Sequence, residues 1–263
     1  MPWTEITRLD YDRRGQRYAS DSTDEEWPLV APFMPPRSRL GRPRRTSMRV
    51  VWDAIQYIAA TGCQRAMLPK DFPPFTTVQH YLYRMRDSGL LDILNDALVD
   101  VSRMLAGRDP ASTAGIIDSQ SVKTTESGGP RGYDAGKKTK GRKRHIVTDT
   151  DGNLLGLVPH GADVQDRDGA PGVIAQAIGN HPTLAHLFAD GGYSGDTFRE
   201  ALNDVGGPTI EIVKRPPGVT GFVVIARRWV VERTFAWLGR CRRLAKDWEA
   251  SIASAIILIT ICN

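Results

Sequence analysis

Two aspartates stand where their side chains could hold a metal ion. Asp118 ends the apolar run 114–117, and Asp190 ends the apolar run 185–189. Such runs predict buried β-strands, and carboxylates at the ends of neighbouring strands, about 4.8 Å apart, would repel each other strongly. A divalent cation between them would relieve the repulsion, and carboxylate oxygens select Mg²⁺, or Mn²⁺ in its place, rather than zinc. An aspartate after a strand is also an ordinary turn residue or helix cap, so the spacing leaves both interpretations open.

A third acid, Glu232, lies in a predicted helix that otherwise carries arginines. Ala236 and Gly239 follow it at i+4 and i+7 and leave space on its face. A carboxylate on a helix lined with positive charge suits a third metal ligand beside a phosphate backbone. An ion pair with Arg228 at i,i+4, worth roughly a few tenths of a kcal/mol, explains the same residue. Spacing does not separate the two interpretations.

Several other catalytic chemistries lack the residues they need. The three cysteines form neither a C-x-x-C pair nor an even framework, which excludes disulfide scaffolds and cysteine-rich zinc sites and indicates a reducing compartment. The glycine-rich stretch after Asp118 does not end in the G-K-[ST] of a P-loop. Ser119 follows Asp118 but has no G-x-S-x-G context. His145, after a basic run, is interpreted as a phosphate contact or a plain surface residue, and Asp166 as a turn acid.

Basic residues gather in three separated clusters, although the formal net charge is only +5. Residues 37–49 hold six arginines and no acid, six of the eight residues 137–144 are basic, and residues 227–246 hold seven basic residues and one acid. Clusters on separate elements suit a polyanion bound across a surface, because each neutralised phosphate releases counterions. Three solvated faces are the alternative interpretation.

Like charges also predict where one of these clusters lies. Six positive charges within residues 137–144 would repel one another unless they were hydrated or faced phosphates, so we expect this segment to be exposed and mobile without DNA. The residues predicted to contact DNA are Arg42, Arg44, Arg45, Lys137, Lys138, Lys140, Arg142, Lys143, Arg144, Arg228, Arg240 and Arg242.

The first part of the chain predicts a small all-helical domain. Residues 49–61, 78–90 and 91–105 carry apolar residues at helical spacing. The acid-rich residues 22–27 predict a capped helix start that stops at Pro28. Helices joined by a tight turn and preceded by an arginine-rich arm are typical of a helix-turn-helix module. A helical bundle for protein contact is the alternative.

After residue 110 the pattern changes to short strands mixed with helices. The predicted strands include residues 114–118, 145–150, 153–160, 185–190 and 208–215, and the predicted helices are residues 169–179, 196–206 and 227–244. A strand pair followed by strands that alternate with helices predicts a mixed α/β sheet covered by helices. We therefore expect an N-terminal DNA-binding domain over residues 1–110 and a catalytic domain over residues 111–263.

The sequence predicts neither membrane insertion nor export. Its longest apolar run, residues 250–262, is shorter than the roughly 20 residues that cross a bilayer. The N-terminus lacks the basic and then apolar layout of a signal peptide. We expect a cytoplasmic protein that lies on the nucleoid when it binds DNA and has no membrane partner. The chain ends at Asn263 within an apolar predicted helix, as a shortened or interrupted copy of a longer reading frame would.

Three blocks of the chain, residues 116–155, 188–195 and 227–249, carry a resemblance to one family. In order and spacing, IIDSQSVKTTESGGPRGYDAGKKTKGRKRHIVTDTDGNLL, FADGGYSG and RRWVVERTFAWLGRCRRLAKDWE resemble the catalytic domain of bacterial insertion-sequence transposases of the insertion-sequence-5 family. Residues 42–89 resemble the helical domain that precedes it there. The resemblance covers roughly residues 22–260.

This resemblance implies an RNase H-like fold with a DDE triad at Asp118, Asp190 and Glu232, which would hold two Mg²⁺ ions. It implies a DNA transposase that binds the terminal inverted repeats of its element, cleaves phosphodiester bonds and joins the 3′-hydroxyl ends to target DNA, with self-association in a synaptic complex. A DNA-binding regulator whose C-terminal domain only dimerises, and an RNase H-like nuclease without strand transfer, are the alternatives.

One part of the family pattern is altered around Glu232. The wider superfamily places a Tyr, an Arg and a Lys at fixed distances from this Glu, and Arg228 matches the Arg. Ile225 stands in place of the Tyr and Gly239 in place of the Lys. Arg240 or Arg242 would supply the missing charge.

Overall fold

The computed structural model describes residues 12–37, 41, 43–213 and 227–263 of the chain. The chain forms two compact units, Met1–Leu90 and Leu91–Asn263. Within the described residues, no helix combines the length and the apolar character that a membrane span requires.

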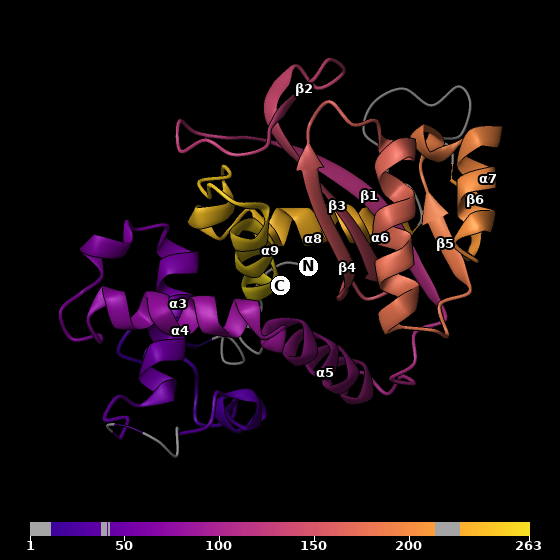
Figure 1. Ribbon diagram of the computed structural model, residues 1–263. Coiled ribbons are helices and arrows are strands. Elements are labelled where there is room, and N and C mark those ends of the chain that lie inside the picture. The colour runs from indigo at the N-terminus through magenta and orange to yellow at the C-terminus, as the bar shows by residue number, and fades with distance from the viewer. Residues whose placement is uncertain (1–11, 38–40, 42, 214–226) are drawn as a thin grey trace. The chain divides into compact units, whose positions relative to one another are not determined.

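The N-terminal unit is helical throughout its described regular structure (Figure 1). Its longest helix, α3, packs Val51, Ile55 and Ile58 into the interior and ends at Gly62, whose φ of 69° is left-handed. The elements of this unit are α2 (Trp27–Val30), η1 (Ala31–Phe33), α3 (Met48–Thr61), η2 (Arg65–Met67) and α4 (Phe75–Asp87).

The first of these helices begins later than the sequence predicts. Thr23 and Glu26 exchange the reciprocal hydrogen bonds of a capping box, at 2.9 and 3.1 Å, but α2 starts only at Trp27 and includes Pro28. The prediction that Pro28 stops a helix is wrong, because the first turn of a helix does not need the N–H that proline lacks.

The C-terminal unit is built on a six-stranded mixed sheet, which confirms the predicted α/β class. Its central strand, β1, is antiparallel to β3 and parallel to β5, and β6 extends the sheet parallel to β5. β4 and β2 are both antiparallel to β3. The strands are β1 (Ala114–Lys123), β2 (Gly132–Asp134), β3 (Thr139–Asp149), β4 (Leu154–Gly161), β5 (His186–Ala189) and β6 (Thr209–Ile212).

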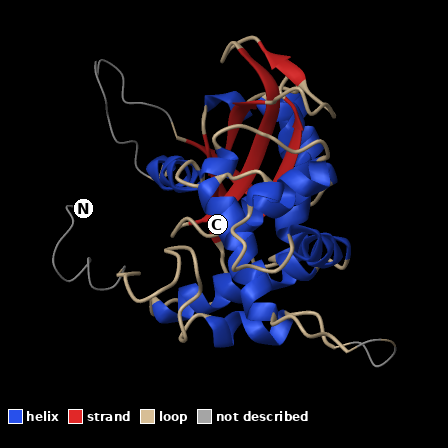
Figure 2. Ribbon diagram, turned by 90° about the vertical axis from the view of Figure 1, so that its left-hand side faces the viewer, coloured by secondary structure: helices blue, strands red, loops and turns tan. Residues whose placement is uncertain are grey.

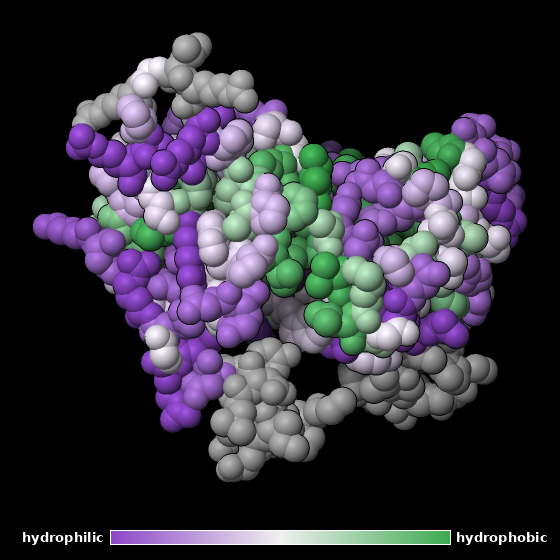
Figure 3. Space-filling model, turned by 90° about the horizontal axis from the view of Figure 1, so that it is seen from below, coloured by the Kyte–Doolittle hydropathy of each residue, from purple (hydrophilic) through white to green (hydrophobic). Residues whose placement is uncertain are grey.

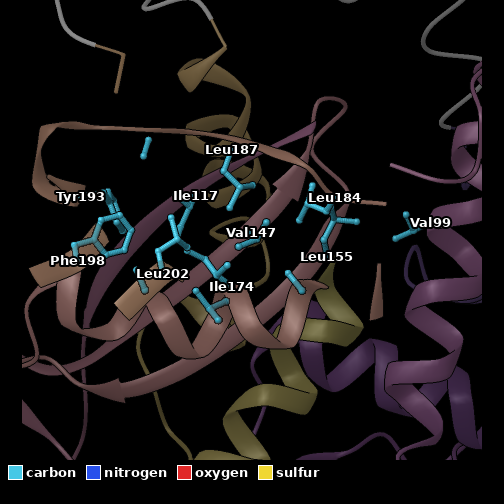
Figure 4. Packing of buried hydrophobic residues seen from close by; sticks show 14 residues of the cluster. Val99, Ile117, Val147, Leu155, Ile174, Leu184, Leu187, Tyr193, Phe198 and Leu202 are labelled. Carbon is cyan, nitrogen blue, oxygen red and sulfur yellow. The ribbon is translucent and has the colours of Figure 1, made fainter. Parts of the chain in front are cut away.

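Helices cover both faces of this sheet (Figures 1 and 2). Successive strand residues point to opposite faces, so Ile117 packs with α6 and α7 while Ile116 packs with α8 and α9. Figure 4 shows the first of these two cores, in which Ile117, Val147 and Leu187 of three strands meet Ile174 of α6 and residues of α7. The helices and turns of this unit are α5 (Leu90–Leu105), α6 (Asp166–Asn180), η3 (Gly191–Tyr193), α7 (Asp196–Asp204), α8 (Arg228–Leu238), η4 (Arg242–Leu244) and α9 (Ile252–Cys262).

Helix α5 belongs almost entirely to the C-terminal compact unit, which begins at Leu91. Arg103 of α5 forms a buried ion pair with Asp149 at 2.7 Å, and Val99 enters the core of the sheet. The periodicity of a helix predicts its apolar face but not the neighbour against which that face packs. Leu105, the last residue of α5, is 83% exposed. Figure 3 shows, in green, hydrophobic residues that reach the surface on one face of the protein.

The basic segment 137–144 is exposed only in its first half. Lys137, Lys138 and Lys140 are exposed, but Arg142, Lys143 and Arg144 lie in β3 and are buried. The prediction of an exposed, mobile segment is therefore wrong for these last three residues. Their charges are compensated by groups distant in sequence, which a count of neighbouring like charges does not reveal.

Arg142 shows how this compensation works. Its guanidinium forms an ion pair with Asp247 at 3.0 Å, and the two side chains are 0% and 2% exposed. It also donates hydrogen bonds to the carbonyl oxygens of Pro130, Glu249 and Ala250 at 2.7–3.1 Å. These contacts fasten the segment between α8 and α9 to the middle of the sheet.

We predict that Arg142→Ala destabilises the C-terminal unit by about 3–5 kcal/mol, because it leaves the Asp247 carboxylate buried without a partner. Urea denaturation followed by tryptophan fluorescence measures this loss. Arg199→Ala is the control, since its ion pair with Asp196 is exposed and contributes about 0–1 kcal/mol. Equal unfolding midpoints for the two variants would contradict the anchoring role of Arg142.

Candidate active site

The two aspartates expected to lie together come from adjacent strands. Asp118 is half-buried within β1, which continues to Lys123 instead of ending at the acid, and Asp190 directly follows β5. Parallel pairing aligns Ile116 of β1 with Phe188 of β5. Continuing this register by two residues places Asp118 beside Asp190, on the sheet face that α8 covers.

The surroundings of Asp118 disfavour its charged form. Burial is the main cause that raises the pKa of Asp118 to about 6, and the negative charge of Asp190 raises it further. The Ser119 N–H, which donates to Asp118 Oδ1 at 2.7 Å, acts in the opposite direction, as do the charges of Arg228 and Lys137. Asp118 is thus an acid that a nearby cation would stabilise.

A tight turn holds the second carboxylate. Asp190 Oδ1 accepts a hydrogen bond from the Gly192 N–H at 2.7 Å. A Cβ atom on residue 192 would lie 2.9 Å from this same oxygen, so a larger residue there would displace the carboxylate. Tyr193 ends the turn with 1% exposure, and its hydroxyl has no hydrogen-bond partner among the residues that the structure describes. Burial raises the pKa of Tyr193, as do the charges of Asp118, Asp166 and Asp190.

Helix α8 brings the third acid to the same place. Arg228 Nη2 lies 3.6 Å from Glu232 Oε1, so the intrahelical ion pair left open by the sequence is present. The same nitrogen lies 3.6 Å from Asp190 Oδ2. Through Arg228, acids from β1, the turn after β5 and α8 therefore belong to one electrostatic group.

The donor set has the chemistry of a magnesium site. Its candidate ligands are carboxylates alone, the hard oxygen donors that Mg²⁺ and Mn²⁺ prefer. Within the described parts of the chain, however, no three acidic, His or Cys side chains stand close enough to hold an ion as they are now placed. The residues therefore fit a divalent cation in type and charge, but they lie farther apart than the ligands of a single bound ion.

A second polar cluster, which sequence reasoning missed, lies beside β1. Asp166, the first residue of α6, accepts hydrogen bonds from Ser119 Oγ at 2.7 Å and from Lys143 Nζ at 2.8 Å. Lys137 Nζ donates to the Ser119 carbonyl oxygen at 3.1 Å. Burial opposes ionisation, but the bonds from Lys143 and Ser119 lower the pKa of Asp166. The sequence pattern indicates a turn acid at Asp166 because only the folded chain places it opposite Ser119.

His145 is fully buried rather than at the surface or on a phosphate. Its Nδ1 lies 2.7 Å from Nε2 of His160, and burial lowers the pKa of His145 to about 3. Gly169 makes room for the pair, since a Cβ atom there would lie 2.5 Å from His160 Nε2. The interpretation of His145 as a phosphate contact or surface residue is wrong, because its place in β3 puts the ring under α6.

The remaining predicted DNA contacts differ in exposure. Arg44 is half-buried and donates to the Pro35 carbonyl oxygen at 2.8 Å, Arg45 is exposed, and Arg42 lies outside the described residues. The helix predicted over residues 227–244 ends at Leu238, because glycine at 239 disfavours its continuation. Arg240 and Arg242 are exposed beyond that end. Ile225, the altered family position, lies outside the described residues.

Comparison with known proteins identifies relatives over most of the chain. The family described as "Transposase DDE domain" matches residues 109–262, and the family described as "Putative transposase of IS4/5 family" matches residues 23–95. A protein of Burkholderia cepacia named "Putative transposase for insertion sequence element IS402" is 35% identical over 133 residues, which are 46% of this chain and 61% of that protein. The chain thus spans somewhat less than two thirds of this relative's length.

The raised pKa of Asp118 predicts a pH-dependent gain from Asp118→Asn. Between about pH 4 and 6 the folded protein binds more protons at this site than the unfolded chain, so wild-type stability falls as pH rises through that window. In metal-free buffer at pH 8 the variant should be more stable by about 1–3 kcal/mol, and the difference should vanish near pH 4. Denaturation at both pH values, with the exposed Asp196→Asn as control, tests this. An equal gain in stability at pH 8 and pH 4 would contradict the raised pKa of Asp118.

Proposed function

Because the chain belongs to the family of transposase DDE domains, as an IS4/IS5-type member, we propose that it is a DNA transposase of the insertion-sequence-5 group. In this proposal the protein binds the terminal inverted repeats of its element, cleaves phosphodiester bonds there and joins the 3′-hydroxyl ends to target DNA. It would associate with further copies of itself when it pairs two element ends.

The sheet order supports an RNase H-like fold for the C-terminal unit. Strands β4, β3 and β1 form an antiparallel meander, and β5 and β6 follow parallel to β1. Each parallel connection includes a helix, and helices cover both faces. The central strand and its parallel neighbour then supply the two aspartates.

The observation that carries the proposal is the convergence of three acids from separate segments. Asp118, Asp190 and Glu232 all lie within the electrostatic reach of the Arg228 guanidinium. We assign them as the catalytic triad and as the ligands of two Mg²⁺ ions, for which Mn²⁺ would substitute. When bound, the ions would activate the attacking oxygen and stabilise the leaving one.

The chain itself holds each ligand in place. Asp118 is fixed in the central strand by its bond from the Ser119 N–H, and Asp190 by its bond from the Gly192 N–H. Glu232 is carried by a helix that packs Val231 and Phe235 into the core, while its own side chain is 51% exposed. An exposed acid beside two fixed ones leaves the site open to a bulky substrate such as DNA.

Basic residues that are exposed, or that border the active site, suit the DNA backbone, and we propose them as its contacts. Arg45 belongs to the arm before α3, in a unit whose helices we propose as a helix-turn-helix-like module for the element ends. Lys137, Lys138 and Lys140 precede or begin β3 near the active site. Arg228 lies within the site, and Arg240 and Arg242 follow α8 on the same polypeptide stretch as Glu232.

We predict that Asp118→Asn, Asp190→Asn or Glu232→Gln each lowers Mg²⁺-dependent nicking of DNA with element ends by more than about 100-fold, since loss of even an outer partner of a metal ligand costs about 10–100-fold. Gel-shift binding to the same DNA should persist, because the exposed basic residues are unchanged. The control is Asp196→Asn, an exposed acid of α7.

The same assays separate the alternative functions. Specific binding without any metal-dependent nicking by the wild-type protein would indicate a DNA-binding regulator. Nicking without strand joining, in a reaction supplied with target DNA, would indicate a nuclease. A Glu232→Gln variant that cuts at the wild-type rate would overturn the triad.

We also predict that Arg45→Ala weakens binding to element ends and lowers the slope of log affinity against log salt by about 0.9, the value for one lost phosphate contact. Fluorescence anisotropy over a salt series measures the slope. Lys70→Ala removes another exposed positive charge of the same unit outside the arm and should leave the slope unchanged. Equal slopes for all three proteins would remove the arm from the DNA interface.

A further inference from the structure

A single guanidinium stands among the three acids. Its Nη2 atom is 3.6 Å from both Asp190 Oδ2 and Glu232 Oε1, and its charge reaches Asp118 as well. An ordinary intrahelical ion pair would involve Glu232 alone. Because one nitrogen is shared between two chain segments, Arg228 offsets part of the negative charge of the site rather than that of Glu232 alone.

The start of α8 directs this arginine into the site. Arg227, the residue before it, has a φ of 68°, a conformation that non-glycine residues rarely adopt and that persists only when the surroundings hold it. The Arg227 guanidinium lies 4.5 Å from the ring centre of Phe188. Arg228, with a side chain only 18% exposed, instead lies at the carboxylates.

These contacts are of a kind that a stronger cation can replace. At 3.6 Å the two contacts of Arg228 are longer than the 2.7–2.9 Å of a charge-assisted hydrogen bond, so Coulomb attraction rather than directed bonding holds the group. The guanidinium contacts the carboxylates of both Asp190 and Glu232, where a cation bound by those two acids would also lie.

We propose that Arg228 is a positioning residue that takes the place of the divalent cation in the ion-free protein and leaves the carboxylates when the cation enters. This inference rests on the proposed function, because it takes Asp118, Asp190 and Glu232 to be metal ligands. In the ion-free state Arg228 limits repulsion among the acids, and for that reason it competes with the metal.

Metal affinity without DNA tests the proposal. Isothermal titration with Mn²⁺ should show about 5- to 10-fold tighter binding by Arg228→Gln than by the wild-type protein, because each of the two partly exposed ion pairs contributes a few-fold. Arg228→Lys keeps the competing charge and should remain closer to wild type. Arg199→Gln, which removes an arginine from the exposed pair with Asp196, should change nothing. In metal-free buffer Arg228→Gln should melt at a lower temperature, and Mn²⁺ should raise that temperature more than it does for wild type.

A measurement on the wild-type protein covers the case in which Arg228→Gln does not fold. The side-chain Nε–H NMR signal of Arg228, assigned by its disappearance in Arg228→Lys, should shift as Mg²⁺ is added, with the midpoint found for Mg²⁺ by calorimetry. A signal that saturating Mg²⁺ leaves unchanged would overturn the displacement.

The outcomes distinguish this inference from the proposed function. Suppose that Mn²⁺ binding is lost in Asp190→Asn and Glu232→Gln, but that Arg228→Gln binds Mn²⁺ no more tightly than wild type. The triad then stands, and the proposal that Arg228 takes the place of the cation is wrong. If Mn²⁺ binding is absent, or is unaffected by those two acid substitutions, the metal site itself fails and both proposals fall.

Discussion

The carboxylate of Asp118 lies in the central strand of the sheet, beside that of Asp190, and groups from separate parts of the C-terminal unit compensate for its charge. Burial and the neighbouring carboxylate both favour the protonated form of Asp118. Arg228 from α8, Lys137 from the turn before β3 and the Ser119 N–H act in the opposite direction. The site therefore depends on cationic groups from other segments, and its negative charge explains why an arginine lies beside the carboxylates.

Strand β3 connects this site to the rest of the unit, because its alternate residues bind different partners on the two faces of the sheet. On one face Arg142 and Arg144 bind carbonyl groups and a carboxylate of the chain after α8. On the other face Lys143 binds Asp166, and His145 pairs with His160. These basic residues of β3 are thus buried and paired on both faces of the sheet. The segment that follows α8, the helix of Arg228 and Glu232, is bound to the sheet through Arg142 and Arg144.

Family membership and geometry are different kinds of observation on the same part of the chain, and they support one another. The family match extends over residues 109–262, whereas the convergence of the acids follows from strand register and from two contacts of Arg228. An open site with one half-exposed carboxylate and exposed basic residues nearby suits a large polyanion better than a small enclosed substrate. This arrangement favours a nucleic-acid enzyme over an enzyme of small metabolites.

The sequence by itself determined what depends on local patterns: the mixed α/β class, the turn at Gly152 between two strands, the helices over residues 49–61 and 169–179, and the three acids as candidates. Period and composition are sufficient for these because each is a property of neighbouring residues. Only the tertiary structure decided that Arg142 and His145 are buried, that α5 packs on the sheet, and that Arg228 contacts Asp190 as well as Glu232. Those facts arise from pairings between residues up to about a hundred positions apart, and the free energy of a buried charge is set by such partners and not by its neighbours in the chain.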